Sequence, residues 1–286
     1  MKITFQRTPV SVPAIMYLSG FTSSLNVDVN RAGDFVFLTR DIQGLSVHFP
    51  HRGTILRVPF VATTYPMIRW VGGSQALLFD GARRQGDNAW LIDDSGTTKL
   101  SFAIGDAVEN VVANGKYIIV THYDEGVFGD DPLAKNGIAV FESSGAFLWG
   151  WNASPLVERL MVYDCYAAGL TDDGATLGAF LYSNYANGPS YAFTLLDIEG
   201  RVAALHAVPD DDLQRPHSLS AGQDGQWLFA SGPLDAQNVI AWRPGDKTYT
   251  TAPSPVYLTR GLGGSRFLSI TDKSVEVVTV TLHHEE

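Results

Sequence analysis

The stretch Ser220-Ala-Gly-Gln-Asp-Gly-Gln-Trp-Leu-Phe-Ala-Ser231 holds the pattern on which the whole chain is built. It predicts a strand, a tight turn at Asp224-Gly225 and a second strand, because a turn that needs a positive φ angle favours glycine. The second strand contains the unbroken apolar run Trp227–Ala230, which indicates that the strand is buried on both faces.

The same turn returns five more times along the chain. The turn glycines are Gly33, Gly73, Gly115, Gly174, Gly225 and Gly264. Successive glycines are 40, 42, 59, 51 and 39 residues apart. These spacings are close to the length of a four-stranded propeller blade. Each repeat continues with a third and a fourth strand, as at Asn88–Asp93 and Lys99–Ile104. The repeat therefore predicts an all-β fold, a six-bladed β-propeller of four-stranded antiparallel blades.

The blades are expected to form a single domain over residues 1–286. Their approximate limits are 21–62, 63–105, 106–153, 154–209, 210–252 and 253–282. The sixth repeat supplies only three strands, at Val256–Gly261, Arg266–Thr271 and Val275–Leu282. The alternating segment Lys2–Arg7 can supply the fourth by pairing with Val275–Leu282, which would close the ring and remove two exposed sheet edges.

Two of the Asp-Gly turns carry a resemblance to known repeats. Thr171-Asp-Asp-Gly-Ala-Thr-Leu177 and Gln223-Asp-Gly-Gln-Trp-Leu228 resemble the WD-like repeats of TolB-type propellers. The resemblance covers the repeat skeleton along most of the chain. It implies the propeller fold, and says little about activity.

The net charge limits the classes of partner, and the cysteine content and the apolar segments indicate the cellular compartment. The formal net charge is −10, which disfavours binding to nucleic acid or to an acidic membrane surface and is compatible with a basic protein partner. The single cysteine, Cys165, excludes an internal disulfide and fits a reducing compartment. No apolar segment near the N-terminus or elsewhere is long enough for a signal peptide or membrane span. A cytoplasmic location is expected.

The longest irregular segments are expected to meet on one face of blades three and four. They are the loops Asp124–Asn136 and Ser183–Ser190 and the connections Ala153–Tyr163 and Pro209–Pro216. Loops longer than their neighbours often carry function, and aromatic side chains among charged ones are typical of a protein interface. The predicted binding residues are Phe128, Asp130, Asp131, Arg159, Tyr185, Asp211, Asp212, Arg215 and His217.

Evidence for catalysis is weaker. Possible metal donors on the inner strands are Asp28, Glu109, Asn110 and Asp164, but their spacing does not repeat across blades as a shared metal site would require. The sequence contains no Gly-x-Ser-x-Gly elbow, P-loop, His-Glu-x-x-His or Cys-x-x-Cys. No catalytic residue, metal or cofactor is therefore predicted.

Three functions remain open at this point. The first is a non-enzymatic module that binds another protein through the loop face of blades three and four. The second is a hydrolase or lactonase with a site at the mouth of the central channel. The residues expected near strand ends on this face, some of them pointing toward the channel mouth, are His122, Tyr123, Arg159, Asp164, Tyr182, Arg215 and His217. The third is the neutralisation of a toxin or another basic protein.

Overall fold

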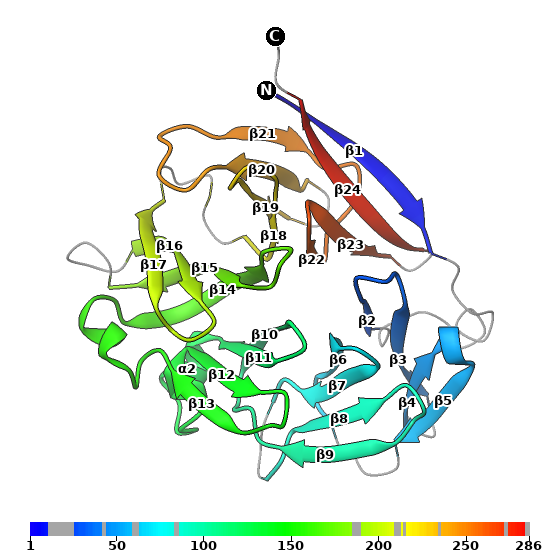
Figure 1. The fold of residues 1–286 in the computed structure, drawn as a ribbon. Coiled ribbons are helices and arrows are strands. Elements are labelled where there is room, and N and C mark those ends of the chain that lie inside the picture. The colour runs from blue at the N-terminus through cyan, green and yellow to red at the C-terminus, as the bar shows by residue number, and fades with distance from the viewer. Residues whose placement is uncertain are drawn as a thin grey trace. The chain divides into compact units, whose positions relative to one another are not determined.

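The computed structural model describes residues 1–10, 26–41, 44–58, 63–82, 86–184, 190–208, 213, 216–233, 236–271 and 274–283. In these residues 24 strands form six four-stranded antiparallel sheets, drawn in Figure 1. The predicted fold class, a six-bladed β-propeller of four-stranded blades, is confirmed. The helices of the described residues are all too short to cross a membrane.

The chain divides into two compact units. The unit Val12–Gly150 contains blades one to three. Blade one consists of β2 (Asn26–Val29), β3 (Phe35–Asp41), β4 (Gly44–Phe49) and β5 (Thr54–Val58), with the 3-10 turn η1 (Pro50–Arg52) before β5; blade two consists of β6 (Pro66–Gly72), β7 (Gln75–Asp80), β8 (Ala89–Asp93) and β9 (Thr98–Phe102). Blade three consists of β10 (Val108–Ala113), β11 (Tyr117–His122), β12 (Ile138–Glu142) and β13 (Phe147–Gly150).

The other unit joins Met1–Ser11 to Trp151–Glu286 and contains blades four to six. Blade four consists of β14 (Val162–Leu170), β15 (Thr176–Ser183), β16 (Ser190–Asp197) and β17 (Val202–Ala207). Blade five consists of β18 (Ser218–Ala221), β19 (Trp227–Ser231), β20 (Asn238–Trp242) and β21 (Thr250–Pro253). Blade six consists of β22 (Arg260–Gly263), β23 (Arg266–Ile270), β24 (Val275–His283) and β1 (Lys2–Pro9).

The second strand of a blade lies between two hydrophobic clusters. In β7, Ala76 and Leu78 pack with blade one, whereas Leu77 and Phe79 pack with blade three. β19 divides its residues between blades four and six in the same way. Because both faces are buried, the second strand needs no polar alternation, and this explains the apolar runs in the sequence.

The tight turns before these strands have the predicted backbone. All six marker glycines have positive φ, at +89° for Gly33, +55° for Gly73, +90° for Gly115, +69° for Gly174, +73° for Gly225 and +57° for Gly264. A left-handed conformation costs little for glycine and more for a residue with a Cβ. The repeat was therefore correctly located by its glycines.

The last blade is completed by the N-terminal strand, as predicted. β1 pairs antiparallel with β24, from Lys2 opposite His283 to Pro9 opposite Glu276, and the two strands lie side by side in Figure 1. The first strand of this blade was predicted too early, since β22 begins at Arg260. The backbone N–H of Leu258 instead donates to the side-chain Oε1 atom of Gln237 at 2.6 Å.

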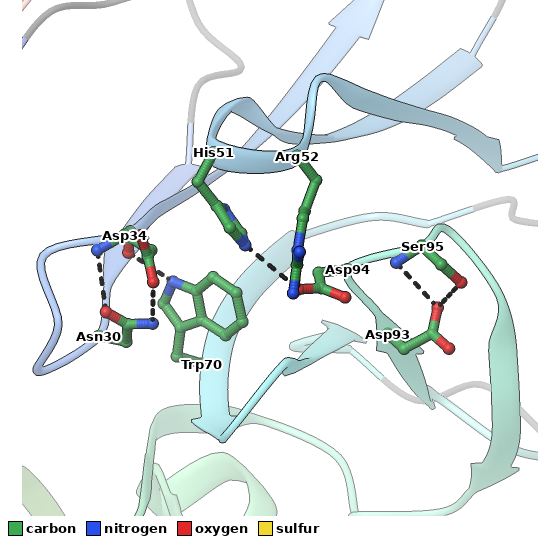
Figure 2. Close-up of polar contacts among 8 residues, drawn as sticks. All are labelled: Asn30, Asp34, His51, Arg52, Trp70, Asp93, Asp94 and Ser95. Carbon is green, nitrogen blue, oxygen red and sulfur yellow. Dashed lines mark hydrogen bonds and ion pairs between the residues drawn. The ribbon is translucent and has the colours of Figure 1, made fainter.

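Polar contacts join blades one and two beside the tight turns (Figure 2). The Nε2 atom of His51 and the Nε atom of Arg52 lie 3.2 and 2.9 Å from Oδ2 of Asp94. The Arg52 guanidinium holds the pKa of Asp94 below its ordinary value. Nearby, the indole N–H of Trp70 donates to the Asp34 carbonyl at 2.9 Å. The contacts of Asp94 connect η1 of blade one with the β8–β9 turn, and the Trp70 contact connects β6 with the β2–β3 turn of blade one. We interpret them as structural.

Candidate functional site

The connection between β11 and β12 in blade three forms a folded platform. It begins with the single-turn helix α2 (Asp124–Val127) and ends with the 3-10 turn η2 (Ala134–Asn136). The N–H of Val127 donates to the Tyr123 carbonyl at 3.0 Å, and that of Phe128 to the Asp124 carbonyl at 2.9 Å. Two carboxylates in the first turn, Asp124 and Glu125, suit the positive end of the helical backbone.

The underside of this platform is buried against its own blade. Val127 and Ala134 are almost inaccessible to solvent. A Cβ atom placed on Gly126 would lie 2.9 Å from the Asp106 carbonyl oxygen and 3.1 Å from Cβ of Ala134. Only glycine allows the helix to approach the preceding connection so closely. The platform is therefore held in place by packing as well as by its own hydrogen bonds.

Asp131 supports the second turn of the platform. Its Oδ1 atom accepts from the N–H of Leu133 at 2.8 Å and from that of Ala134 at 3.2 Å. Asn136 complements it by donating from Nδ2 to the carbonyl of Leu133 at 2.9 Å. Asp131 was predicted as a binding residue from its position in the loop, which stays a prediction. In the structure its carboxylate binds the backbone at the start of η2.

The exposed residues of the platform and of Tyr123 just before it are aromatic and acidic. Phe128 is 63% exposed and Tyr123 is 41% exposed. Three acidic residues close to Tyr123 and Phe128 in the sequence are also exposed, namely Asp124, Glu125 and Asp130. Phe128 and Asp130 are thus on the surface, where the sequence predicted them. An arrangement of this kind offers an apolar contact area within a negative field.

A further exposed aromatic residue on blade two, Tyr65, was missed by the sequence analysis. Tyr65 is 66% exposed. The carboxylate of Asp80 holds its backbone, accepting from the Tyr65 N–H at 2.7 Å, and Gly81 donates to the Tyr65 carbonyl at 2.9 Å. The Gly81 carbonyl in turn accepts from Val108 of blade three at 2.9 Å. The only sequence signal was a tyrosine before Pro66, which is not specific.

Two of the predicted binding residues are described in the unit of blades four to six. Arg159 is exposed at the end of η3 (Pro155–Glu158). His217 is half-buried and stacks on Tyr257, with ring centroids 5.0 Å apart. Burial lowers the pKa of His217, and its Nε2 atom lies 3.1 Å from the Leu258 carbonyl oxygen. His217 therefore has a structural role at the junction of blades five and six.

The remaining predicted binding residues, Tyr185, Asp211, Asp212 and Arg215, lie outside the described residues. Phe128, Asp130 and Asp131 belong to one compact unit, whereas Arg159 and His217 belong to the other. The expectation that all nine residues share one surface therefore stays a prediction.

The inner strands were the other possible location of a site. Asp28 accepts from the Trp70 backbone N–H at 2.7 Å, and Asn26 accepts from that of Ile68 at 2.8 Å. Side chains of β2 thus bind the backbone of β6, so Asp28 has a structural contact. Over the described ranges of the chain, no three His, Cys, Asp or Glu residues are grouped as metal ligands.

Comparison with known proteins gives the fold alone. No protein-family model matches the sequence, and no curated protein matches it. Among solved structures, the PQQ-bound aldose sugar dehydrogenase of Streptomyces coelicolor is similar over 97% of this chain and 99% of its own, with a TM-score of 0.56 and 12% identity. A nidogen structure in complex with laminin is similar over 90% of this chain and 84% of its own, with a TM-score of 0.52 and 12% identity. The structure of U3-55K covers 90% of this chain and 81% of its own, with a TM-score of 0.53 and 10% identity.

Proposed function

We propose that the protein is a non-enzymatic propeller that binds another protein through the Asp124–Asn136 platform of blade three. The observation that carries the proposal is the 63% exposure of Phe128 on a loop whose underside is buried. A large aromatic side chain that contributes so little to its own core is available as an anchor for a partner.

The platform suits binding because it is already ordered. Hydrogen bonds fix the backbone of Val127 and Phe128, and Asp131 fixes the following turn. A partner that contacts Phe128 would therefore immobilise few additional bonds, since aromatic side chains have little rotamer entropy to lose. A preorganised anchor increases affinity chiefly by reducing this cost.

The charge around the anchor favours a basic partner. Asp124, Glu125 and Asp130 are exposed, and Lys135 is the only cation in the sequence from 123 to 137. Their field would steer a positively charged surface toward Phe128 during encounter. Arg159, Tyr185, Asp211, Asp212, Arg215 and His217, the other residues that the sequence predicted, remain candidates for binding in this proposal.

Phe128→Ala is expected to weaken binding strongly. Truncation of a central aromatic anchor costs about 2 kcal/mol or more, which corresponds to roughly a 30-fold loss of affinity. The measurement is quantitative capture of partners from native lysate, followed by the Kd of the purified partner. Ile55→Ala is the matched control, because Ile55 is 57% exposed on the outer strand β5 of the same unit. Equal capture by the parent and the Phe128 variant would refute the proposal.

The acidic residues are expected to act on a different kinetic step. Asp130→Asn should slow association at low salt and leave dissociation nearly unchanged, because exposed charges mainly steer the encounter. Phe128→Ala should accelerate dissociation at any salt concentration. Stopped-flow or surface-plasmon measurements at two ionic strengths separate the two effects. A salt-independent association rate in the parent protein would exclude the steering role.

A further inference from the structure

Directly beneath the platform lies a buried histidine with an unused nitrogen. His122 is the last residue of β11, and its side chain has no solvent exposure. Its Nδ1 atom lies 3.0 Å from the Asp106 carbonyl oxygen, while the buried Nε2 atom has no hydrogen-bond partner among the residues that the structure describes. Because a carbonyl can only accept, we assign the proton of the neutral ring to Nδ1.

The platform itself covers this ring. A Cβ atom placed on Gly105 would lie 2.7 Å from Cε1 of His122, 3.0 Å from the backbone nitrogen of Ala134 and 3.3 Å from Cβ of Leu133. His122 and the start of η2 therefore converge on the same small space. The backbone agrees, since the His122 N–H donates to the Gly137 carbonyl, at the end of the platform, at 2.9 Å.

A proton on Nε2 would place a charge and an N–H group where none of the described residues supplies an acceptor. Burial lowers the pKa of His122 to about 4, against the opposite effects of the Asp106 carbonyl and the Asp131 and Asp106 carboxylates. The charged residues on the elements around the ring are Asp106 before β10, Glu109 on β10, Asp124 and Glu125 on α2, and Asp131 and Lys135 on the second half of the platform. Only Asp106 and Asp131 among them act on the ring, and burial outweighs both.

We propose that His122 is an acid-sensitive latch: its protonation releases the Asp124–Asn136 platform from blade three while the blades themselves stay folded. Opening the platform costs less free energy than unfolding the blade, because it exposes the protonated ring to solvent without disrupting the hydrogen bonds between the strands. The effect of the latch on partner binding rests on the proposed function, whereas the test of the latch requires no partner.

The pH range follows from the two pKa values of His122. The ordinary value is 6.5 and the folded value is about 4, so the open platform binds the proton more tightly. The preference for the closed platform is therefore complete above pH 6.5 and is lost as the pH falls toward 4. The ratio of closed to open platform should fall about 20-fold between pH 7 and pH 5.

Hydrogen exchange of the full chain at pH 7 and pH 5, corrected for intrinsic rates, tests the latch. We expect the amides of Val127, Phe128 and Lys135, whose hydrogen bonds hold the turns of the platform, to lose protection about 20-fold at pH 5. The amides of β11 before His122 and those of β12 should keep their protection. In His122→Phe, whose ring cannot take a proton, and in the smaller His122→Gln, protection of the platform should no longer depend on pH.

His48→Phe is the matched control. His48 is also buried in the same unit, on β4, and burial lowers its pKa too. This variant should retain the pH response of the platform. The latch is refuted if platform protection is equal at the two pH values, if both His122 variants keep the response, or if β11 and β12 lose protection together with the platform. None of these results bears on whether Phe128 binds a partner at neutral pH.

Discussion

Gly261→Ala is expected to destabilise the unit of blades four to six severely. A Cβ atom at position 261 on β22 would lie 1.7 Å from the carbonyl oxygen of Leu219 on β18, and 3.0 Å from the backbone nitrogen of Ser220. These neighbours are backbone atoms of a buried inner strand, so no rotamer change can relieve the contact. β22 would have to move away from β18, at a cost of about 3 kcal/mol or more.

Leu219 is also approached from the other side, which prevents β18 from yielding. A Cβ atom on Gly169 of β14 would lie 2.8 Å from the same carbonyl oxygen. Chemical denaturation measures the loss of stability. The control is Gly225→Ala, where nothing lies within 4 Å and the only cost is the positive φ of +73°, about 1 kcal/mol. A smaller loss in Gly261→Ala than in this control would show that β22 can shift freely.

The repeat was readable from the sequence because its signals are local. A turn glycine depends on its own φ angle, and the apolar run of a second strand reflects burial on both faces. The start of β22 was not readable, because Gln237 of the preceding blade binds the backbone of Leu258 and removes it from the strand. No pattern within residues 256–261 reports a contact made by a side chain some twenty positions earlier.

The candidate site shows the same limit. Loop length and residue type correctly placed Phe128 and Asp130 on the surface of blade three. The backbone contact of Asp131 with Leu133 and the burial of His122 depend on how the loop folds back on its own blade. Tyr65 comes from a different blade and is connected to blade three through backbone hydrogen bonds of Gly81. Such relations are tertiary, and the spacing of residues does not encode them.

Removal of Met1–Thr8 is expected to have an effect as large as that of Gly261→Ala. It deletes all of β1 except Pro9, and with it the strand that covers β24. Ile3 is buried in the cluster of blades five and six, and its loss alone costs about 2 to 3 kcal/mol. The deletion also removes Arg7, whose guanidinium donates to the Glu276 carboxylate at 2.6 and 2.8 Å, and leaves that nearly buried carboxylate without its cation.

Thermal unfolding of the truncated protein should therefore show a decrease in Tm of about 10 °C or more, because the exposed edge of β24 adds to the loss of apolar burial. A synthetic peptide with the sequence of Lys2–Pro9, added in excess, should recover part of the decrease, since a ligand that binds only the folded state stabilises it. The control is removal of residues 284–286, which leaves β24 intact to its last residue, His283. If the N-terminal truncation melts with the parent protein, or the peptide has no effect on a destabilised truncation, then β1 does not complete the last blade in solution.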